Sequence, residues 1–166
     1  MLASSSGDVP NNQWAHIAAV RTSTASNDTK LYVNGILRAT GTDTNNWTVI
    51  TSPTVGGIAL AGYVTTGYIS NIRVVKGVAV YTGAFTPPTS PLTATQSSGT
   101  NIAAITGTST SLLTCQSTTF IDNSTNNFTI SAFGNSQPTI QNPFGYTSAT
   151  TNGYTVSTIG GSGYFD

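Results

Sequence analysis

The sequence has little charge, and this scarcity excludes several classes of function. Its 166 residues include five Lys or Arg and five Asp, and there is no glutamate. Charged residues make up 6% of the chain, against about 25% in ordinary soluble domains. A nucleic-acid groove or a polybasic membrane patch needs clustered cations, which five scattered ones do not supply. We therefore expect neither a nucleic acid nor a membrane as a partner.

Cysteine, histidine and long apolar runs are also scarce. Cys115 is the only cysteine, so an internal disulfide is excluded, and its apolar neighbours indicate a small buried residue. One His and one Cys do not make a structural zinc site. No apolar stretch approaches the roughly 20 residues that span a bilayer, and the first residues lack the pattern of a signal peptide.

Small polar residues are abundant in place of charged ones. The chain contains 31 Thr, 19 Ser and 14 Asn, while 37% of its residues are hydrophobic. This content is apolar enough for a core, and the length suits one domain of ordinary size. Because helices normally present Glu, Lys and Arg to solvent, the composition favours strands.

The first half of the sequence reads as closely spaced strands. The strongest local signal is Asn34-Gly35 between two apolar runs, because this dipeptide suits a type I′ hairpin turn. No window has a convincing helical period. The strands expected here are Trp14–Arg21, Lys30–Val33, Ile36–Ala39, Trp47–Ile50, Val55–Leu60, Gly67–Val75 and Val78–Tyr81.

The second half begins with a break in regular structure. Prolines at 87, 88 and 91 disrupt strand pairing, and the small polar residues that follow predict a linker or loop over 95–110. Asp122 to Asn127 predicts an Asx-type turn. An irregular segment is expected at 134–152, around Pro138 and Pro143. Further strands are expected at Ser111–Cys115, Thr119–Ile121, Phe128–Phe133, Tyr154–Ile159 and Tyr164–Phe165.

Three motifs occur in a recognisable order in the first half. They are Trp14–Ala18 (WAHIA), Leu31–Gly35 (LYVNG) and Gly67–Arg73 (GYISNIR). As a set, they resemble the concanavalin A-like, laminin G-like jelly-roll family. The continuation from Val74 to Pro88 resembles the branch found in virion structural proteins of tailed phages. The resemblance implies an antiparallel two-sheet sandwich that is often carbohydrate-binding or adhesive, without catalysis.

The order of the two halves is unusual for that family. Residues 1–94 resemble the later part of a unit, and residues 108–166 resemble the opening part of one, with motifs such as Gly163–Asp166 (GYFD). We therefore expect three parts: 1–94, a linker or loop at 95–110, and 111–166. The sandwich is then either incomplete, or completed by its own C-terminal segment, or completed by a neighbouring subunit. A trailing segment would pair beside Gly67–Val75.

Hydrolase chemistry fits the sequence poorly. Glycoside hydrolysis generally needs two carboxylates about 5–9.5 Å apart, and five dispersed Asp without Glu offer no such pair. His16 lies in a strand pattern and no Gly-x-Ser-x-Gly elbow occurs, so a structural histidine is expected rather than a triad member. We expect no enzyme.

The sequence offers candidate residues for a sugar-binding site and for a calcium site. A sugar site needs an aromatic platform beside amides and hydroxyls, which predicts Asn45, Asn46 and Trp47, with Tyr63 as a second aromatic. The alternative for Trp47 is a place in the core. Calcium is a weaker expectation, and its candidates in Asn- and Thr-rich turns are Asp28, Asp43 and Asp122, for which turn capping is the competing interpretation.

The leading hypothesis is a structural or adhesive β-sandwich of a phage virion, in a tail, fibre or capsid surface. Its expected partners are other virion subunits, copies of itself and a surface glycan. The alternative is an autonomous carbohydrate-binding module of an extracellular or cell-surface protein.

Overall fold

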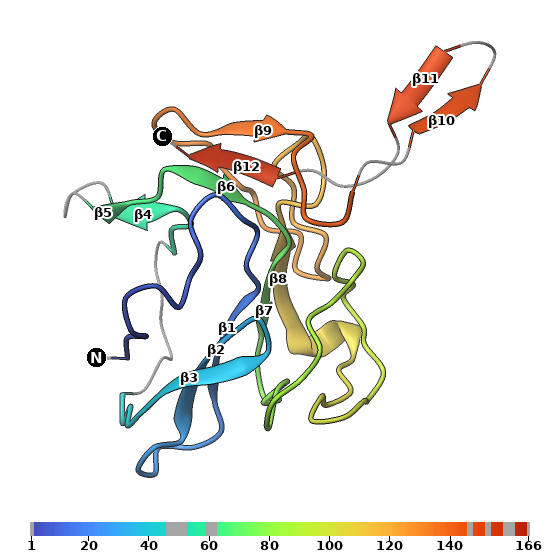
Figure 1. The fold of residues 1–166 in the computed structure, drawn as a ribbon. Helices are drawn as coiled ribbons and strands as arrows, with labels where there is room; N and C mark the ends of the chain where they lie inside the picture. The colour runs from blue at the N-terminus through green and yellow to red at the C-terminus, as the bar shows by residue number, and fades with distance from the viewer. Residues whose placement is uncertain are drawn as a thin grey trace. The chain divides into compact units, whose positions relative to one another are not determined.

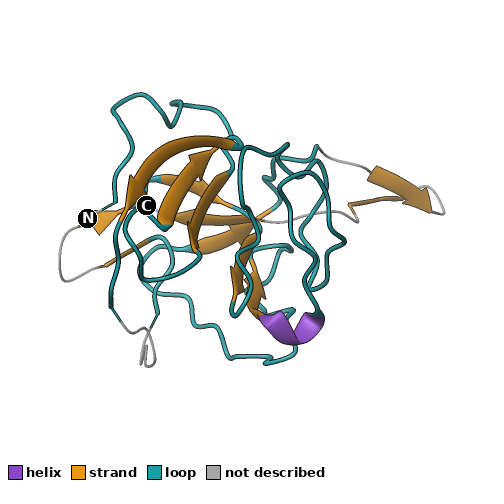
Figure 2. Ribbon diagram, turned by 90° about the horizontal axis from the view of Figure 1, so that it is seen from below, coloured by secondary structure: helices purple, strands orange, loops and turns teal. Residues whose placement is uncertain are grey.

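Strands and loops make up the structure, a computed structural model that describes residues 2–45, 53–58, 63–145, 148–151, 154–157 and 162–165. Within these ranges the helical structure is one 3₁₀ turn at Gly107–Ser109 (Figure 2). The strands are β1 (Ile17–Arg21), β2 (Thr29–Val33), β3 (Ile36–Gly41), β4 (Gly57–Ile58), β5 (Tyr63–Val64), β6 (Gly67–Ile69), β7 (Ile72–Val75), β8 (Thr110–Thr114), β9 (Gln137–Thr139), β10 (Ser148–Thr151), β11 (Tyr154–Ser157) and β12 (Ser162–Phe165).

The predicted all-β class with antiparallel sheets is confirmed. The pairs β1–β2, β2–β3, β4–β5, β6–β12, β9–β12 and β10–β11 are antiparallel. No helix in the described part of the chain has the length and apolar character needed to cross a bilayer.

The chain folds into two compact units that alternate along the sequence. Unit 1 comprises Met1–Ile50, Val75–Pro88 and Thr95–Ser109. Unit 2 comprises Thr51–Val74, Thr89–Ala94 and Thr110–Asp166. Each unit is therefore built from segments that are distant in sequence.

A three-stranded sheet in the order β1-β2-β3 organises unit 1 (Figure 1). Its tight hairpin turns at Asn34 and Gly35, whose φ angles are 50° and 77°. Two successive positive φ angles are what a type I′ turn requires, so the predicted hairpin is confirmed. The register shifts between Leu31 and Tyr32, which pair with Ala39 and Leu37, so that Arg38 is the extra residue of a bulge in β3.

The core of unit 1 is largely aromatic and β-branched. Its buried residues come from the sheet and from the two loop segments that follow it in the unit: Val20, Tyr32, Val80, Tyr81, Phe85 and Ile105.

The strand predicted at Val78–Tyr81 is wrong. This run is apolar because Val80 and Tyr81 pack in the core, while its ladder is limited to an isolated bridge between Tyr81 and Ile102. Hydrophobicity here marks burial rather than a strand.

The segment 95–109 is a loop that folds back on itself. Gln96 bridges Ile105 and Gly99 bridges Ile102, each in antiparallel sense. Ile105 is 5% exposed and belongs to the core of unit 1. Residues 95–109 are therefore part of unit 1.

The sheet of unit 2 closes with the last strand of the chain. Its order is β6-β12-β9, with Tyr164 opposite Tyr68 and Gly163 opposite both Ile69 and Pro138 (Figure 1). The trailing segment thus pairs beside Gly67–Ile69 in its own chain, as one of the predicted alternatives required.

Unit 2 also contains three smaller strand pairs: β4 with β5, β7 with β8, and β10 with β11. The predicted strand Gly67–Val75 is interrupted at Asn71, which has a φ of 57°. The strands predicted at Thr119–Ile121 and Phe128–Phe133 are wrong, because both segments are irregular. The strand predicted at Trp47–Ile50 lies outside the described residues, as do Leu60 and Ala59 of the predicted strand Val55–Leu60.

Candidate functional site

Arg21 fixes the loop that leads to the predicted sugar-binding residues. It ends β1, and its Nη1 donates hydrogen bonds of 2.7 Å to the carbonyl oxygen of Asn45 and 3.4 Å to that of Asp43. The same nitrogen lies 3.3 Å from Oδ2 of Asp43 in an ion pair. The side chains of Arg21 and Asp43 are 30% and 22% exposed, so the pair is partly shielded from water.

The Asp43 carboxylate also shapes the loop from within. Its Oδ1 accepts hydrogen bonds from the backbone N–H of Asn45 at 3.0 Å and from Nδ2 of Asn45 at 2.9 Å. This is an Asx turn, which holds the backbone of residues 43–45 in place. Since the Arg21 and Asp43 charges neutralise each other, the base of the loop is polar and without net charge.

The predicted sugar-binding residues are only partly placed. Asn45 is exposed at the base of the loop, whereas Asn46 and Trp47 lie outside the described residues. Tyr63 lies in β5 of unit 2, opposite Ile58 of β4. Asn45 belongs to unit 1. A single sugar site that combines Asn45 and Trp47 with Tyr63 therefore stays a prediction. The sequence analysis did not single out Arg21. The available signal was a single cation at the end of an apolar strand, because a partly buried cation usually has a carboxylate or carbonyl partner.

The three candidate calcium ligands are each engaged in a local turn. Asp28 accepts a hydrogen bond from the Ser23 hydroxyl, and Asp43 is bound as described above. Asp122 accepts hydrogen bonds from its own segment and from β8. Within the described ranges, no group of three or more His, Cys, Asp or Glu side chains is arranged to hold a metal ion.

Asp122 is the most heavily bonded of these carboxylates. It is 4% exposed, and it accepts backbone hydrogen bonds from Leu113 at 3.0 Å, Ser124 at 2.9 Å and Phe128 at 2.9 Å, with a further one from the Ser124 hydroxyl. Burial alone would raise the pKa of Asp122, but these hydrogen bonds outweigh it and hold the pKa below the ordinary value of an aspartate. The carboxylate is therefore kept ionised and ties the 122–128 turn to β8.

His16 and Cys115 occupy structural surroundings. The His16 ring meets the rings of Tyr81 and Phe85 edge-on, with centroids 5.8 Å and 5.5 Å apart. Cys115 is buried, and its carbonyl oxygen accepts a 2.9 Å hydrogen bond from the backbone N–H of Asn71. His16 thus contributes to the packing of unit 1, and Cys115 to a backbone hydrogen bond within unit 2.

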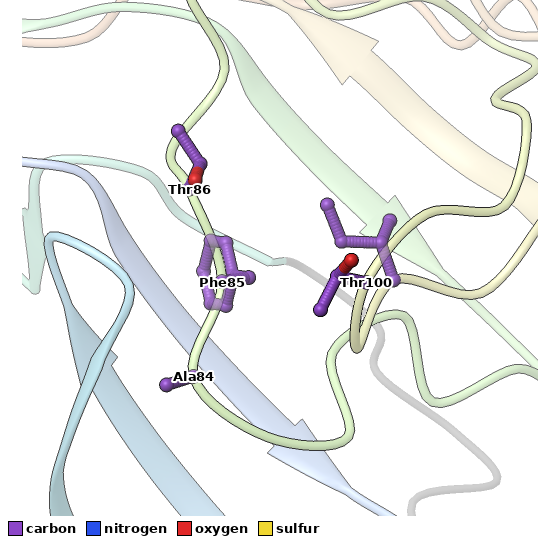
Figure 3. Close-up of a pocket in the computed structure, with 5 residues that line it drawn as sticks. Ala84, Phe85, Thr86 and Thr100 are labelled. Atoms are coloured by element: carbon purple, nitrogen blue, oxygen red, sulfur yellow. The ribbon is translucent and has the colours of Figure 1, made fainter.

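A neutral pocket opens on the loops of unit 1 (Figure 3). Its volume is about 410 Å³, and we call it the Phe85 pocket after its central ring. Phe85 is buried and stacks on Tyr81, with ring centroids 3.7 Å apart and planes 8° from parallel. The face of the Phe85 ring packs against Tyr81 in the core, so this ring is a poor stacking platform for a sugar. The lining residues are Ala84, Phe85, Thr86, Thr100 and Ile102.

Sequence reasoning also missed this pocket. Its residues come from two loops, around 84–86 and 100–102, and no local pattern joins them. Asn101 holds the loops together, because its Nδ2 donates a 2.6 Å hydrogen bond to the carbonyl oxygen of Ala84.

Comparison with known proteins identifies the family from the first half of the chain. The family model for the concanavalin A-like lectin/glucanases superfamily, of the laminin G type, matches residues 2–88. Neither the curated proteins nor the solved structures contain a significant match. The matched range holds the β1–β3 hairpin sheet and the Phe85 loop, and it covers more than half of the 166 residues. The chain therefore belongs to the concanavalin A-like lectin/glucanase superfamily.

Proposed function

We propose that the chain is a non-enzymatic structural and adhesive β-sandwich of a tailed-phage virion, whose adhesive contact is with a neutral glycan. Membership of the superfamily supports the adhesive part, because such sandwiches often bind carbohydrate. The resemblance of Val74–Pro88 to the branch of virion structural proteins supports the setting in a tail, fibre or capsid surface. The partners in this proposal are other virion subunits or copies of the chain.

The placement of the carboxylates supports a role without catalysis. Glycoside hydrolysis generally needs two carboxyl groups flanking one bond, and the sequence has no glutamate. Asp8 accepts a hydrogen bond from the backbone N–H of Ser5 in its own loop and forms a 3.3 Å ion pair with Arg38 of β3, so it too is engaged by the fold. Like Asp28, Asp43 and Asp122, it serves the fold locally.

The observation that carries the glycan proposal is the neutral, anchored base of the 43–45 loop. A saccharide without charge presents hydroxyl groups and an apolar face, so it is recognised by amides, hydroxyls and an aromatic ring. Arg21 fixes residues 43–45, and a fixed segment loses less conformational entropy on binding. Asn46 and Trp47, the other residues proposed to bind the glycan, are next in the sequence. Arg21 acts here as a positioning residue, through Asp43 and Asn45.

The alternative function, an autonomous carbohydrate-binding module, also has an observation in its favour. The strand that pairs with β6 is β12 of the same chain, which supports a unit that folds by itself. A chain that stays monomeric at every concentration while binding glycan would favour this alternative.

A glycan array followed by calorimetry on the best ligand tests the proposal. The parent chain should bind a neutral glycan, Trp47→Ala should weaken binding at least tenfold, and Arg21→Ala should weaken it severalfold. Arg21→Lys should recover part of that loss, because an ammonium group can still bind the Asn45 carbonyl oxygen. The matched control is Thr100→Arg in the Phe85 pocket, which should bind as the parent does. Absence of binding by the parent, or loss in Thr100→Arg with retention in Trp47→Ala, overturns the proposed site.

A further inference from the structure

The Asn34-Gly35 dipeptide that forms the β2–β3 turn is also a chemically reactive pair. An asparagine followed by glycine is prone to deamidation, because glycine has no side chain to keep its backbone nitrogen from the neighbouring amide carbon. The sequence contains this pair twice, at Asn34-Gly35 and at Asn152-Gly153. The second pair lies outside the described residues, whereas the surroundings of Asn34 are described.

The reaction at Asn34 uses the backbone nitrogen of Gly35 and water. The Gly35 N–H loses its proton to hydroxide, and its nitrogen attacks Cγ of Asn34, so that a C–N bond forms. The side-chain nitrogen takes a proton from water and leaves as ammonia, which produces a cyclic succinimide. Water then opens the succinimide at either of its carbonyl carbons. One opening gives aspartate, and the other gives isoaspartate, in which the backbone runs through the side chain.

Two hydrogen bonds hold Asn34 away from this reaction. Its Oδ1 accepts a 2.9 Å hydrogen bond from the backbone N–H of His16, and its own N–H donates a 2.8 Å hydrogen bond to the carbonyl oxygen of His16. The side-chain amide thus takes the place of a backbone carbonyl and extends the β1–β2 ladder beyond Ile17 and Val33. Closure of the succinimide draws the amide towards Gly35, which breaks the hydrogen bond from His16.

Gly35 is enclosed by the core of unit 1. It is buried, and its carbonyl oxygen accepts a 3.1 Å hydrogen bond from the backbone N–H of Phe85. The Phe85 ring stacks on Tyr81, with centroids 3.7 Å apart, and both rings meet His16 edge-on. Hydroxide therefore reaches the Gly35 nitrogen when the hairpin separates from these residues, which is a local opening of the fold.

We infer that Asn34 is a modification site that the fold holds unreactive: it deamidates when the β2–β3 hairpin opens, and its isoaspartate product keeps the hairpin from closing again. Isoaspartate lengthens the backbone of the turn by a carbon atom, which is incompatible with the tight turn that sets Val33 opposite Ile36. Aspartate leaves the backbone unchanged and keeps an oxygen for the N–H of His16. The inference concerns the integrity of unit 1 over time and does not depend on the proposed function.

Incubation at mildly alkaline pH followed by peptide mapping tests the inference. Trypsin cleaves after Lys30 and Arg38, so position 34 is recovered in the peptide Leu31–Arg38, in which chromatography and mass spectrometry separate asparagine, aspartate and isoaspartate. A synthetic peptide of the same sequence gives the rate without the fold. The folded chain should deamidate at Asn34 more slowly than this peptide by about tenfold or more, and the chain in urea should react at close to the peptide's rate. Equal rates in the folded chain and in the peptide overturn the inference.

Two tyrosine variants locate the protection in the hairpin. Tyr81→Leu removes the ring that stacks on Phe85, so the hairpin should open more often and Asn34 should deamidate severalfold faster than in the parent. Tyr68→Leu is the matched control, because Tyr68 is an exposed residue of β6 in unit 2, and it should react at the parent's rate. Circular dichroism checks that both variants are folded, and if Tyr81→Leu is not, the comparison of the folded parent with the peptide decides. A common rate in the two folded variants contradicts the assigned protection.

The two products are distinguished by refolding. Chain that has reacted in urea is returned to buffer, folded and unfolded chains are separated by size-exclusion chromatography, and the peptide Leu31–Arg38 is recovered from each fraction. Isoaspartate at position 34 should be enriched in the unfolded fraction, whereas aspartate should be distributed as asparagine is. Asn34→Asp should accordingly unfold at the same urea concentration as the parent. An equal distribution of the two products overturns the role assigned to isoaspartate.

Discussion

The backbone N–H of Phe85 donates a 3.1 Å hydrogen bond to the carbonyl oxygen of Gly35, so the tip of the β2–β3 hairpin is joined to the Phe85 loop. A Cβ atom built on Gly35 would lie 1.8 Å from the carbonyl oxygen of Phe85. The absence of a side chain at Gly35 is therefore required twice, by its positive φ and by this close approach. Both contacts lie within unit 1 and connect the hairpin to the core.

Gly35→Ala should lower the free energy of unfolding by more than about 3 kcal/mol, because conformational strain and a backbone clash add. Gly77→Ala is the matched control: its φ is 79°, and a Cβ there meets nothing within 4 Å. The control should cost about 1 kcal/mol, the strain alone. Urea unfolding followed by fluorescence measures both. Equal losses in the two variants would contradict the steric part of the argument.

Asp122→Ala should destabilise the chain by about 3 kcal/mol, because it leaves the N–H groups of Leu113, Ser124 and Phe128 without their acceptor. Asp28→Ala is the control, since Asp28 serves an exposed turn, and it should cost less than about 1 kcal/mol. Chemical denaturation compares the two variants. A small loss at Asp122 would show that water replaces the carboxylate there.

The Asp122 contribution should depend on pH in one direction. Because the pKa of Asp122 in the folded chain lies below its value in the unfolded chain, its stabilisation is complete above the unfolded pKa and is lost as the pH falls through the folded pKa. The stability gap between the parent and Asp122→Asn should therefore be constant near neutrality and narrow in acid. Denaturation curves from pH 7 downwards measure it. A gap that keeps its size at every pH would contradict the assigned role of the charge.

Tyr164→Pro should destabilise unit 2 by about 3 kcal/mol and promote aggregation. Tyr164 lies in β12, which has a paired strand on both sides, so the lost N–H interrupts a central strand. Tyr164→Val separates the loss of the ring from the loss of the donor and should retain the sheet. Thermal unfolding with light scattering detects both effects. If the two variants behave alike, the backbone pairing of β12 contributes little.

The hairpin sheet of unit 1 was predictable because its signal is local. Asn34-Gly35 dictates its own turn, and the alternation beside it places Tyr32 in the core. Strand β9 was missed because proline argues against a strand, yet Pro138 is tolerated where β9 pairs with β12 as the outer strand of its sheet. The strand predicted at Phe128–Phe133 is wrong. Its two phenylalanines are exposed to solvent, so this apolar segment does not mark a buried strand.

The candidate sites divide in the same way. The Asx turn at Asp122 was predictable from adjacent residues, whereas its bond to Leu113 joins a different strand and left no trace in the sequence. The Arg21 clamp is likewise a long-range pairing that composition does not reveal. The sugar-binding assignment of Asn45, Asn46, Trp47 and Tyr63 remains a prediction. Turns formed by adjacent residues could therefore be predicted from the sequence. Hydrogen-bond and ion-pair partners that are distant in the sequence could not.

The position of β12 also makes unit 2 depend on a pairing that is distant in sequence. Strand β6 (Gly67–Ile69) pairs with β12 (Ser162–Phe165), and strands β7 to β11 all lie between them in the chain. Pairings of this sequence separation form slowly, since a long loop must close first. When the denatured chain refolds, the side of β6 that pairs with β12 is therefore exposed until β12 arrives, and during that interval it is open to pairing with another chain.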